Sequence, residues 1–402
     1  MRQQSYLNSA KKILESYAGD IPFAAFLKKQ FAANKKFGST DRKQIAALCY
    51  HYFRLGNELH QASAEERLIT ATFLCEQAPN EFLAFHKPEW NILTHKPVEE
   101  KIAIAQIDIR KLFPWADALS DEVDPVAFCS SFFTQPLFFL RTRPGQKKNV
   151  LRKLDDAGLP YSLVGDDCIA LPISTKIDSL LVLDKEVVVQ DYNSQKVLDI
   201  LKQHYPVSAI HRPVSVWDCC AASGGKSLLA YDILNGKIDL TVSDIRESIL
   251  SNLKKRFSAA GIKNYQSFIA DLQTHPERGQ KTNFKPQTSN FELIICDAPC
   301  TGSGTWGRTP EQLCFFSGDR IAEYAARQQQ IVSNVIPKLK KGGLFIYITC
   351  SVFKAENEAI VDFIKEKFHL RLLQMELLKG YDKKADSMFT AAFVQSGSLS
   401  GS

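Results

Sequence analysis

Residues 214–230, VSVWDCCAASGGKSLLA, decide the fold that the sequence predicts. An apolar run with β-branched residues ends at Asp218, a turn of small residues follows, and a helix with leucines begins near Ser227. Gly224 and Gly225 let the backbone approach a bound molecule closely, and the start of the helix offers N–H groups to a polar or anionic group. The stretch therefore predicts a nucleotide or nucleoside-cofactor site at the carboxyl end of the first strand of an α/β sheet.

Two kinds of cofactor compete for this loop. The Gly-Lys-Ser ending matches a phosphate-binding P-loop, but the glycine needed five positions before the last one is replaced by Cys220. A second strand, expected over 238–244, ends in Asp244, whose carboxylate is suited to hydrogen bonds from ribose hydroxyls. We therefore expect an adenosine-type cofactor held by its sugar and base. A P-loop NTPase remains the rival from another class, and a plain surface turn is the simplest alternative.

Composition bounds the class of protein. The chain has 402 residues, so two or three domains are expected, and 45% hydrophobic with 23% charged residues is typical of a globular protein. No signal-like segment follows Met1 and no apolar run approaches the length of a membrane span. The ten cysteines lack the spacing of a zinc site. We expect a cytoplasmic monomer with free thiols, no metal and no membrane contact.

Basic residues are concentrated at the N-terminal end. Residues 1–60 hold ten Lys or Arg against four acids, an excess equal to the whole chain's net charge of +6. Such an end suggests contact with phosphates, although solvated helix faces that happen to be basic explain the count equally well.

Apolar periodicity divides the chain into parts. Residues 1–125 read as an all-helical domain, with helices expected at 6–17, 23–33, 41–55, 65–77 and 98–113. Residues 136–195 read as a small α+β subdomain of the RRM-like kind, whose Arg141, Arg143 and nearby lysines either meet RNA backbone or are solvated; the paired stacking aromatics of an RRM are missing. Residues 196–395 alternate strands and helices, which predicts a largely parallel, doubly wound sheet. Residues 396–402 read as a disordered Ser/Gly tail.

Acids and thiols collect at the predicted strand ends, where function gathers in open α/β sheets. The acids are Asp218, Asp244, Asp271 and Asp297, and the thiols are Cys300 and Cys350. A thiolate is a strong nucleophile, and its addition to C6 of a cytosine makes C5 reactive enough to accept a methyl group. A base then removes the C5 proton and the thiol leaves. The pattern favours methyl transfer to a ring carbon.

Long motifs carry a family resemblance. The segments DCCAASGGK (218–226), DAPCTGSG (297–304) and YITCSVFKAENE (347–358) resemble the signatures of the Sun (RsmB-type) RNA cytosine-C5 methyltransferases. VVVQDYNSQ (187–195) is similar to the segment that precedes the catalytic domain in that family. FGSTDRKQIAALCYHYFRLG (37–56) resembles its helical, NusB-like RNA-binding domain. The resemblance implies a class I (Rossmann-like) sheet that uses S-adenosylmethionine.

The resemblance also implies roles for residues. Cys350 would be the nucleophile, Cys300 would assist elimination and product release, and Asp297 would hold the cytosine edge near the cofactor. Asp244 would bind the ribose hydroxyls and Asp271 the adenine amino group. The methionine end of the cofactor would be wrapped by Cys220, Ala221, Ala222, Ser223, Gly224, Gly225 and Lys226.

The chain departs from the family pattern at two positions. Ser223 stands where proline is usual, which makes the free loop less rigid, and Cys219 stands where an apolar residue is usual. Cys296 is expected in the core beside the motif, and the remaining thiols, Cys49, Cys75, Cys129, Cys168 and Cys314, are interpreted as structural.

The resulting hypothesis is an S-adenosylmethionine-dependent RNA cytosine-C5 methyltransferase that acts on ribosomal (16S-type) RNA. The target base must be unstacked to reach a thiol, so a single-stranded or unfolded region is the expected substrate. A tRNA methyltransferase and a catalytically silent RNA-binding assembly factor remain alternatives.

Overall fold

The computed structural model describes residues 2–273 and 290–395 of the chain. They fall into two compact units. The helical unit comprises Met1–Leu119, Val123–Pro136 and Thr305–Gly318, and the sheet unit comprises Ser120–Glu122, Leu137–Gly304 and Asp319–Ser402. The tail expected at 396–402 lies outside the described residues.

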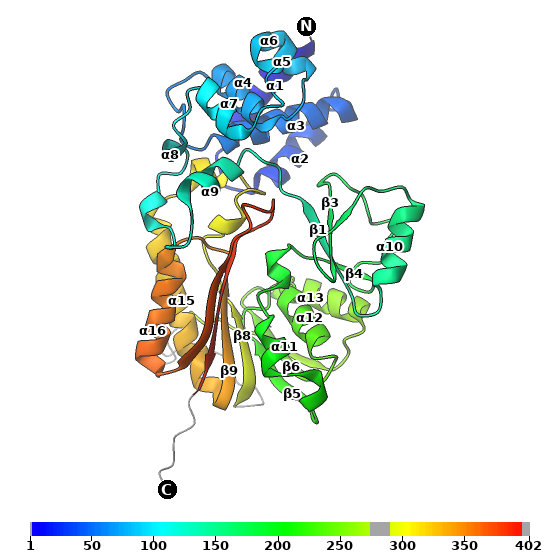
Figure 1. Cartoon of the computed structure of the whole chain (residues 1–402), viewed down its shortest axis with the longest axis vertical. Helices are drawn as coiled ribbons and strands as arrows, with labels where there is room; N and C mark the ends of the chain where they lie inside the picture. The colour runs from blue at the N-terminus through cyan, green and yellow to red at the C-terminus, as the bar shows by residue number, and fades with distance from the viewer. Residues whose placement is uncertain (1, 274–289, 396–402) are drawn as a thin grey trace. The chain divides into compact units, whose positions relative to one another are not determined.

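The helical unit follows the apolar periodicity of the sequence, with some breaks (Figure 1). The expected helix at 98–113 is two helices, because Gln106 adopts a left-handed conformation (φ 55°) and the Asp108 side chain caps a new helix by accepting a hydrogen bond from Arg110 N. Its elements are α1 (Arg2–Glu15), α2 (Phe23–Ala33), α3 (Ser39–Arg54), α4 (Ala64–Cys75), α5 (Glu81–His86), α6 (Pro88–Asn91), α7 (Val98–Ile104), α8 (Ile109–Leu112), η1 (Ala116–Ala118), α9 (Pro125–Ser131) and α14 (Gln312–Phe315).

The segment Thr305–Gly318 belongs to the helical unit, although the sequence analysis placed it in the catalytic domain. Trp306 is 1% exposed and packs against aromatic side chains, with its ring centroid 5.9 Å from that of Phe113. The buried Arg54 guanidinium donates to the carbonyl of Gly307 at 3.0 Å and to that of Phe132. A late piece of the chain therefore completes the core of a domain that the early residues begin.

A four-stranded antiparallel sheet and one helix form the α+β subdomain, which is part of the sheet unit. Residues 162–171 form a hairpin, since the chain bends around Gly165. The helix packs Val150 and Leu154 on Leu140 and Ile169 of the sheet. The elements are β1 (Phe138–Thr142), α10 (Lys147–Asp156), β2 (Ser162–Leu163), β3 (Cys168–Leu171) and β4 (Val187–Val189), in the order β2-β3-β1-β4.

The main sheet confirms the expected α/β class. Its seven strands run in the order β10-β11-β9-β8-β5-β6-β7; the last five are parallel, whereas β11 is antiparallel to both β9 and β10. The strands are β5 (Val214–Asp218), β6 (Ile238–Asp244), β7 (Tyr265–Ile269), β8 (Phe291–Asp297), β9 (Leu339–Thr349), β10 (Arg371–Leu378) and β11 (Met388–Val394).

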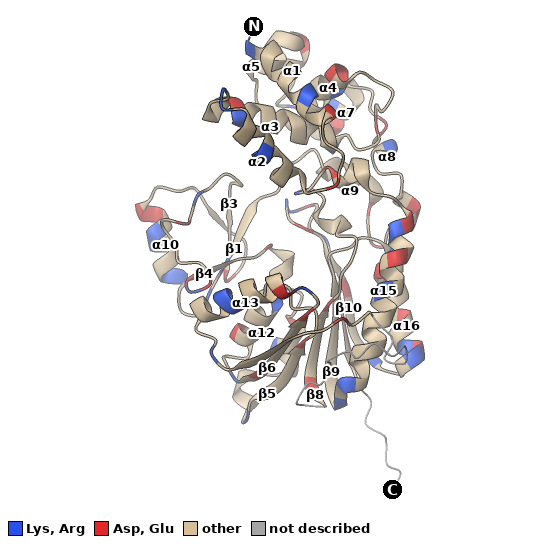
Figure 2. Cartoon of the chain, turned by 180° about the vertical axis from the view of Figure 1, so that it is seen from behind, with Lys and Arg blue, Asp and Glu red and all other residues tan. Residues whose placement is uncertain are grey.

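Helices lie on both sides of this sheet (Figures 1 and 2), with α12 and α13 on one side and α15 and α16 on the other. Alternate strand residues such as Val216, Leu240 and Leu293 share a buried cluster with Leu228 of α12 and Leu253 of α13. The remaining elements are η2 (Asn193–Gln195), α11 (Ile200–His204), η3 (Val207–Ala209), α12 (Gly225–Ile233), α13 (Glu247–Ala260), η5 (Ser303–Thr305), α15 (Asp319–Val335), η6 (Ile336–Lys338), η7 (Lys354–Glu356) and α16 (Glu358–Phe368). Among the described residues, no helix is both long and apolar enough to cross a membrane.

Candidate active site

The carboxyl ends of the parallel strands meet at one cavity of about 420 Å³. This size lies within the usual range of about 300–1,000 Å³ for small-molecule sites. Both motif thiols line the cavity, but of the four strand-end acids that the sequence predicts there, only Asp244 and Asp297 do. The lining residues are Cys219, Cys220, Ala222, Asp244, Ile245, Arg246, Ala270, Leu272, Gln273, Asp297, Ala298, Pro299, Cys300, Tyr324, Arg327, Ile331 and Cys350.

The loop after β5 is shaped by close packing. Gly224 has φ 83°, and a Cβ there would lie 2.7 Å from the Phe257 ring, so this position accepts only glycine without rearrangement. Ser223, which replaces the usual proline, accepts hydrogen bonds from the Arg256 guanidinium at its carbonyl (3.0 Å) and hydroxyl (3.1 Å). Arg256 is itself fixed by an ion pair with Asp184. These bonds restrain a loop that lacks the proline ring.

Asp244 links the second strand end to the loop. Its Oδ2 accepts a hydrogen bond from Ala222 N at 3.0 Å, and its Oδ1 accepts one from Arg246 N at 2.9 Å. The Arg246 guanidinium also pairs with this carboxylate, but its side chain is 57% exposed and is free to turn toward solvent. The neighbouring Ile245 is 48% exposed and lines the cavity. An acid with an apolar neighbour fits a ribose hydroxyl pair beside an adenine face.

Lys226 pairs with Asp297, which lines the cavity, and a second acid, Asp218, is buried at the end of β5. Lys226 Nζ is 3.1 Å from Asp297 Oδ2, and although burial opposes the charge, the Asp297 carboxylate raises the pKa of Lys226. Asp218 is fully buried and accepts a hydrogen bond from Ser227 Oγ, while its Oδ1 has no hydrogen-bond partner. Burial raises the pKa of Asp218 to about 7. A polar group of a molecule bound at the loop would give Asp218 Oδ1 the hydrogen-bond partner that it lacks.

Cys300 and Cys350 meet at the edge of the cavity, with their Sγ atoms 3.3 Å apart. The hydrogen bond with the Cys350 sulfur, together with burial, raises the pKa of Cys300 well above its usual value. Either sulfur can be the donor of the hydrogen bond that joins the two thiols. Gly304 fixes the Cys350 backbone, because its N–H donates to the Cys350 carbonyl at 2.9 Å and a Cβ there would lie 2.2 Å from the Ser387 carbonyl.

The buried carboxylate of Glu356 connects the two thiol-bearing loops. Its Oε1 accepts hydrogen bonds from Thr301 Oγ1 and Ser351 Oγ, each at 2.6 Å. Its Oε2 accepts from Thr301 N and from Gln328 Nε2, each at 2.9 Å. Thr301 directly follows Cys300, and Ser351 directly follows Cys350. Glu356 thus holds together the segments that carry the thiols, and it is a positioning residue.

The structure separates the expected site residues into two groups. Cys220, Ala222, Asp244, Asp297, Cys300 and Cys350 line the cavity, whereas Ala221, Ser223, Gly224, Gly225, Lys226 and Asp271 do not. Asp271 lies beyond the end of β7, with its neighbours Ala270 and Leu272 on the cavity wall. The sequence does not predict Tyr324 and Arg327 as site residues. They lie on α15, and a single face of a helix carries no recognisable sequence motif. Glu356 was quoted within a motif, but its buried contacts are not visible in the sequence.

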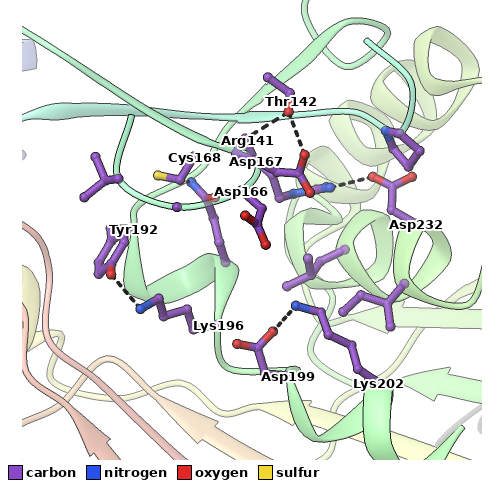
Figure 3. A pocket seen from close by; sticks show the side chains of 16 residues that line it. Arg141, Thr142, Asp166, Asp167, Cys168, Tyr192, Lys196, Asp199, Lys202 and Asp232 are labelled. Atoms are coloured by element: carbon purple, nitrogen blue, oxygen red, sulfur yellow. Dashed lines mark hydrogen bonds and ion pairs between the residues drawn. The ribbon is translucent and has the colours of Figure 1, made fainter. Parts of the chain in front are cut away.

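A second cavity, of about 360 Å³, lies between the α+β subdomain and α12 (Figure 3). The sequence predicts that Arg141 and Arg143 either meet RNA backbone or are solvated, and this prediction is wrong. Both are buried and pair with Asp232 of α12, at 2.6 and 2.9 Å. They join the subdomain to α12. Four aspartates and three basic side chains line this cavity, so acids outnumber bases and the cavity does not favour binding of a phosphate.

Comparisons with known proteins agree with this geometry. Residues 209–394 match the model of the family described as 16S rRNA methyltransferase RsmB/F. The chain is 28% identical over 236 residues to the ribosomal RNA small subunit methyltransferase B of Serratia proteamaculans, covering 57% of this chain and 50% of that protein. It is 27% identical over 257 residues to the probable methyltransferase B of Bacillus subtilis, covering 63% and 54%. The chain thus spans about half the length of these relatives.

Solved structures show the same fold at low identity. The crystal structure of PH0851 matches over 98% of both chains, with a TM-score of 0.68 and 16% identity. NSun6 from Pyrococcus horikoshii with SFG matches over 72% of this chain and 98% of that one, with a TM-score of 0.51 and 14% identity.

The Glu356 network can be tested by substitution. We expect Glu356→Ala to destabilise the fold by about 2–4 kcal/mol, because it removes four hydrogen bonds and leaves Thr301 N without an acceptor. We also expect it to slow the formation of a Cys300–Cys350 disulfide under mild oxidant by roughly tenfold, since the two loops lose their common anchor. Thermal unfolding and peptide mass spectrometry measure the two effects.

Glu366→Ala, at an exposed position of α16, is the matched control and should change neither quantity. Disulfide formation at the parent rate in a folded Glu356→Ala variant would contradict the positioning role.

Proposed function

We propose that the chain methylates C5 of a cytosine in ribosomal RNA through a covalent cysteine adduct, since residues 209–394 match the model of the family described as 16S rRNA methyltransferase RsmB/F. The observation that carries this proposal is the pair of thiols, 3.3 Å apart, at the wall of the cavity. Methyl transfer to an oxygen or an exocyclic nitrogen needs no thiol, whereas attack by C5 of a cytosine requires prior addition of a nucleophile at C6. Two adjacent thiols at one cavity support the C5 chemistry.

The cavity fits S-adenosylmethionine, which supplies the methyl group when bound. Asp244 would accept hydrogen bonds from the ribose hydroxyls once Arg246 turns toward solvent, and Ile245 would pack on the adenine. The loop from Cys220 to Lys226 would enclose the methionine end. Asp271 would reach the adenine amino group through a change of its side chain, because it does not line the cavity.

The chain's own residues divide the remaining work. Cys350 adds through Sγ to C6, and its proton passes to a base or to solvent. Asp297, held by Lys226, accepts a hydrogen bond from the cytosine amino group. After C5 has gained the methyl group, a base removes the C5 proton, the C5–C6 double bond re-forms and the C6–Sγ bond breaks. Cys300, which retains its proton, protonates the departing Cys350 sulfur and so assists product release.

A basic hollow on the helical unit supports contact with RNA. A cavity of about 490 Å³ lies between α1 and α2. It is lined by neutral polar side chains, by Ile13 and Phe37, and by Lys12 and Lys36, with no acid among them. Exposed Lys28 and Lys29 add positive charge to α2 (Figure 2). Such a surface suits a phosphate backbone, whose contacts dominate affinity without reading sequence. The helical unit would hold the RNA while the sheet unit acts on an unstacked base.

Methyl transfer from labelled S-adenosylmethionine to RNA from cells lacking the protein tests the proposed reaction. We expect label in RNA 5-methylcytosine, lost on the order of 10³-fold or more in Cys350→Ala because the nucleophile is gone. Cys300→Ala should instead accumulate protein covalently attached to RNA, because release is impaired.

Absence of label in every RNA fraction, with cofactor bound, would contradict the enzyme and favour a silent RNA-binding assembly factor. Label found in tRNA alone would contradict the proposal that ribosomal RNA is the substrate, but it would still support methylation of cytosine C5.

RNA binding by the helical unit is tested by the salt dependence of affinity. Lys12→Gln with Lys36→Gln should reduce the slope of log K against log[salt] by about 1.5, since each lost phosphate contact removes roughly 0.7–0.9. Cofactor affinity should not change. A titration of labelled RNA at several salt concentrations measures the slope.

Lys96→Gln is the matched control, because Lys96 lies in the same unit but is paired with Glu100. An unchanged slope in the double variant would contradict this assignment of the RNA surface.

A further inference from the structure

Three thiols converge beside the cofactor loop. The Sγ atoms of Cys219, Cys220 and Cys296 all lie within 4.8 Å of one another. Cys219 and Cys220 directly follow β5, whereas Cys296 lies in the neighbouring strand β8. The register explains the convergence, because Asp218 faces Ile295 across the two parallel strands, so the next residues on each strand also face each other. The sequence analysis excluded a metal site from local spacing, and this cluster is not local.

The sulfur separation suits a metal ion. Metal–sulfur bonds of about 2.3 Å place the three sulfurs of a planar trigonal site about 4.0 Å apart. A separation of at most 4.8 Å therefore needs only small side-chain movements to close around an ion. Soft thiolate ligands select thiophilic ions such as Zn²⁺, Cd²⁺ and Cu⁺ over the hard ions that prefer oxygen.

The cluster is both enclosed and reachable. Cys219 and Cys296 are 1% and 0% exposed, so the strands hold their sulfurs in place and exclude water. Cys220 is only partly buried, and both Cys219 and Cys220 line the 420 Å³ cavity. An ion can enter through the cavity, bind first to the accessible thiol and then reach the buried pair.

We propose that Cys219, Cys220 and Cys296 form a three-thiolate binding site for a thiophilic metal ion at the base of the cofactor loop. Binding of a divalent ion to three thiols releases up to three protons and forms three metal–sulfur bonds, with no change in oxidation state. The site is separate from the Cys300–Cys350 pair and does not depend on the proposed methyl transfer.

Titration of the reduced full-length chain with Cd²⁺ tests the site, since cadmium–thiolate bonds give an ultraviolet absorption band. We expect a single tight ion, whose affinity falls by roughly 100-fold or more in Cys219→Val and in Cys296→Val. Valine keeps the buried volume and suits a strand, and circular dichroism checks the fold. Cys220→Ala is a third test of the same site. Cys220 is only partly buried at the cavity wall, so its replacement should disturb the packing of the core less.

The double variant Cys300→Ala with Cys350→Ala is the control, because it removes the other thiol pair of the cavity. It should retain the band and the affinity of the parent chain. Three results would overturn the proposal: loss of the band in this control, an unchanged band in the folded Cys219, Cys220 and Cys296 variants, or absence of the band from the parent chain.

Discussion

The structure depends on one buried carboxylate that ties two loops together. Glu356 is fully buried, and burial raises its pKa, so its presence is tolerable only because several donors satisfy both of its oxygens. Those donors follow the two thiols in the chain, or come from Gln328 of α15. Removing the acid breaks four hydrogen bonds and takes from Thr301 N its acceptor, whereas Gln328 Nε2 still donates to the Pro299 carbonyl and Thr301 Oγ1 to Ser303 Oγ. The 3.3 Å thiol separation is therefore a property of the network rather than of either loop alone.

The parallel sheet supplies the rest of the site by register. Because β5, β6, β8 and β9 run in the same direction, Asp218, Asp244, Asp297 and the residue after Thr349 arrive at one edge. Glycine is required at the points where the loops pass closest to their neighbours, notably Gly224 against Phe257 and Gly304 against the Ser387 carbonyl. The strands that the core fixes therefore place Asp244, Asp297 and Cys350 at this edge, and the Glu356 network and α15 complete the cavity.

Much of this arrangement was predictable, for definite physical reasons. Alternating apolar strands with acids at their ends predicted the sheet, the cavity edge and the approach of Cys300 to Cys350. Contacts between distant residues were not predictable. The burial of Arg141 and Arg143 against Asp232 depends on how the subdomain packs on α12, and the place of Trp306 depends on aromatic partners from the other end of the chain. The three-thiol cluster depends on the pairing of β5 with β8, which a search for local cysteine spacing does not include.

The central claim is that Cys350, whose sulfur lies 3.3 Å from that of Cys300, attacks the target base. The most direct measurement is peptide mass spectrometry of the chain after incubation with S-adenosylmethionine and ribosomal RNA that contains 5-fluorocytidine. Fluorine at C5 cannot be removed as a proton, so the adduct cannot be released and the attacking sulfur remains labelled. The account predicts a cytosine adduct on the peptide that contains Cys350. An adduct on the Cys300 peptide, or methylation of the RNA without any adduct, would contradict it.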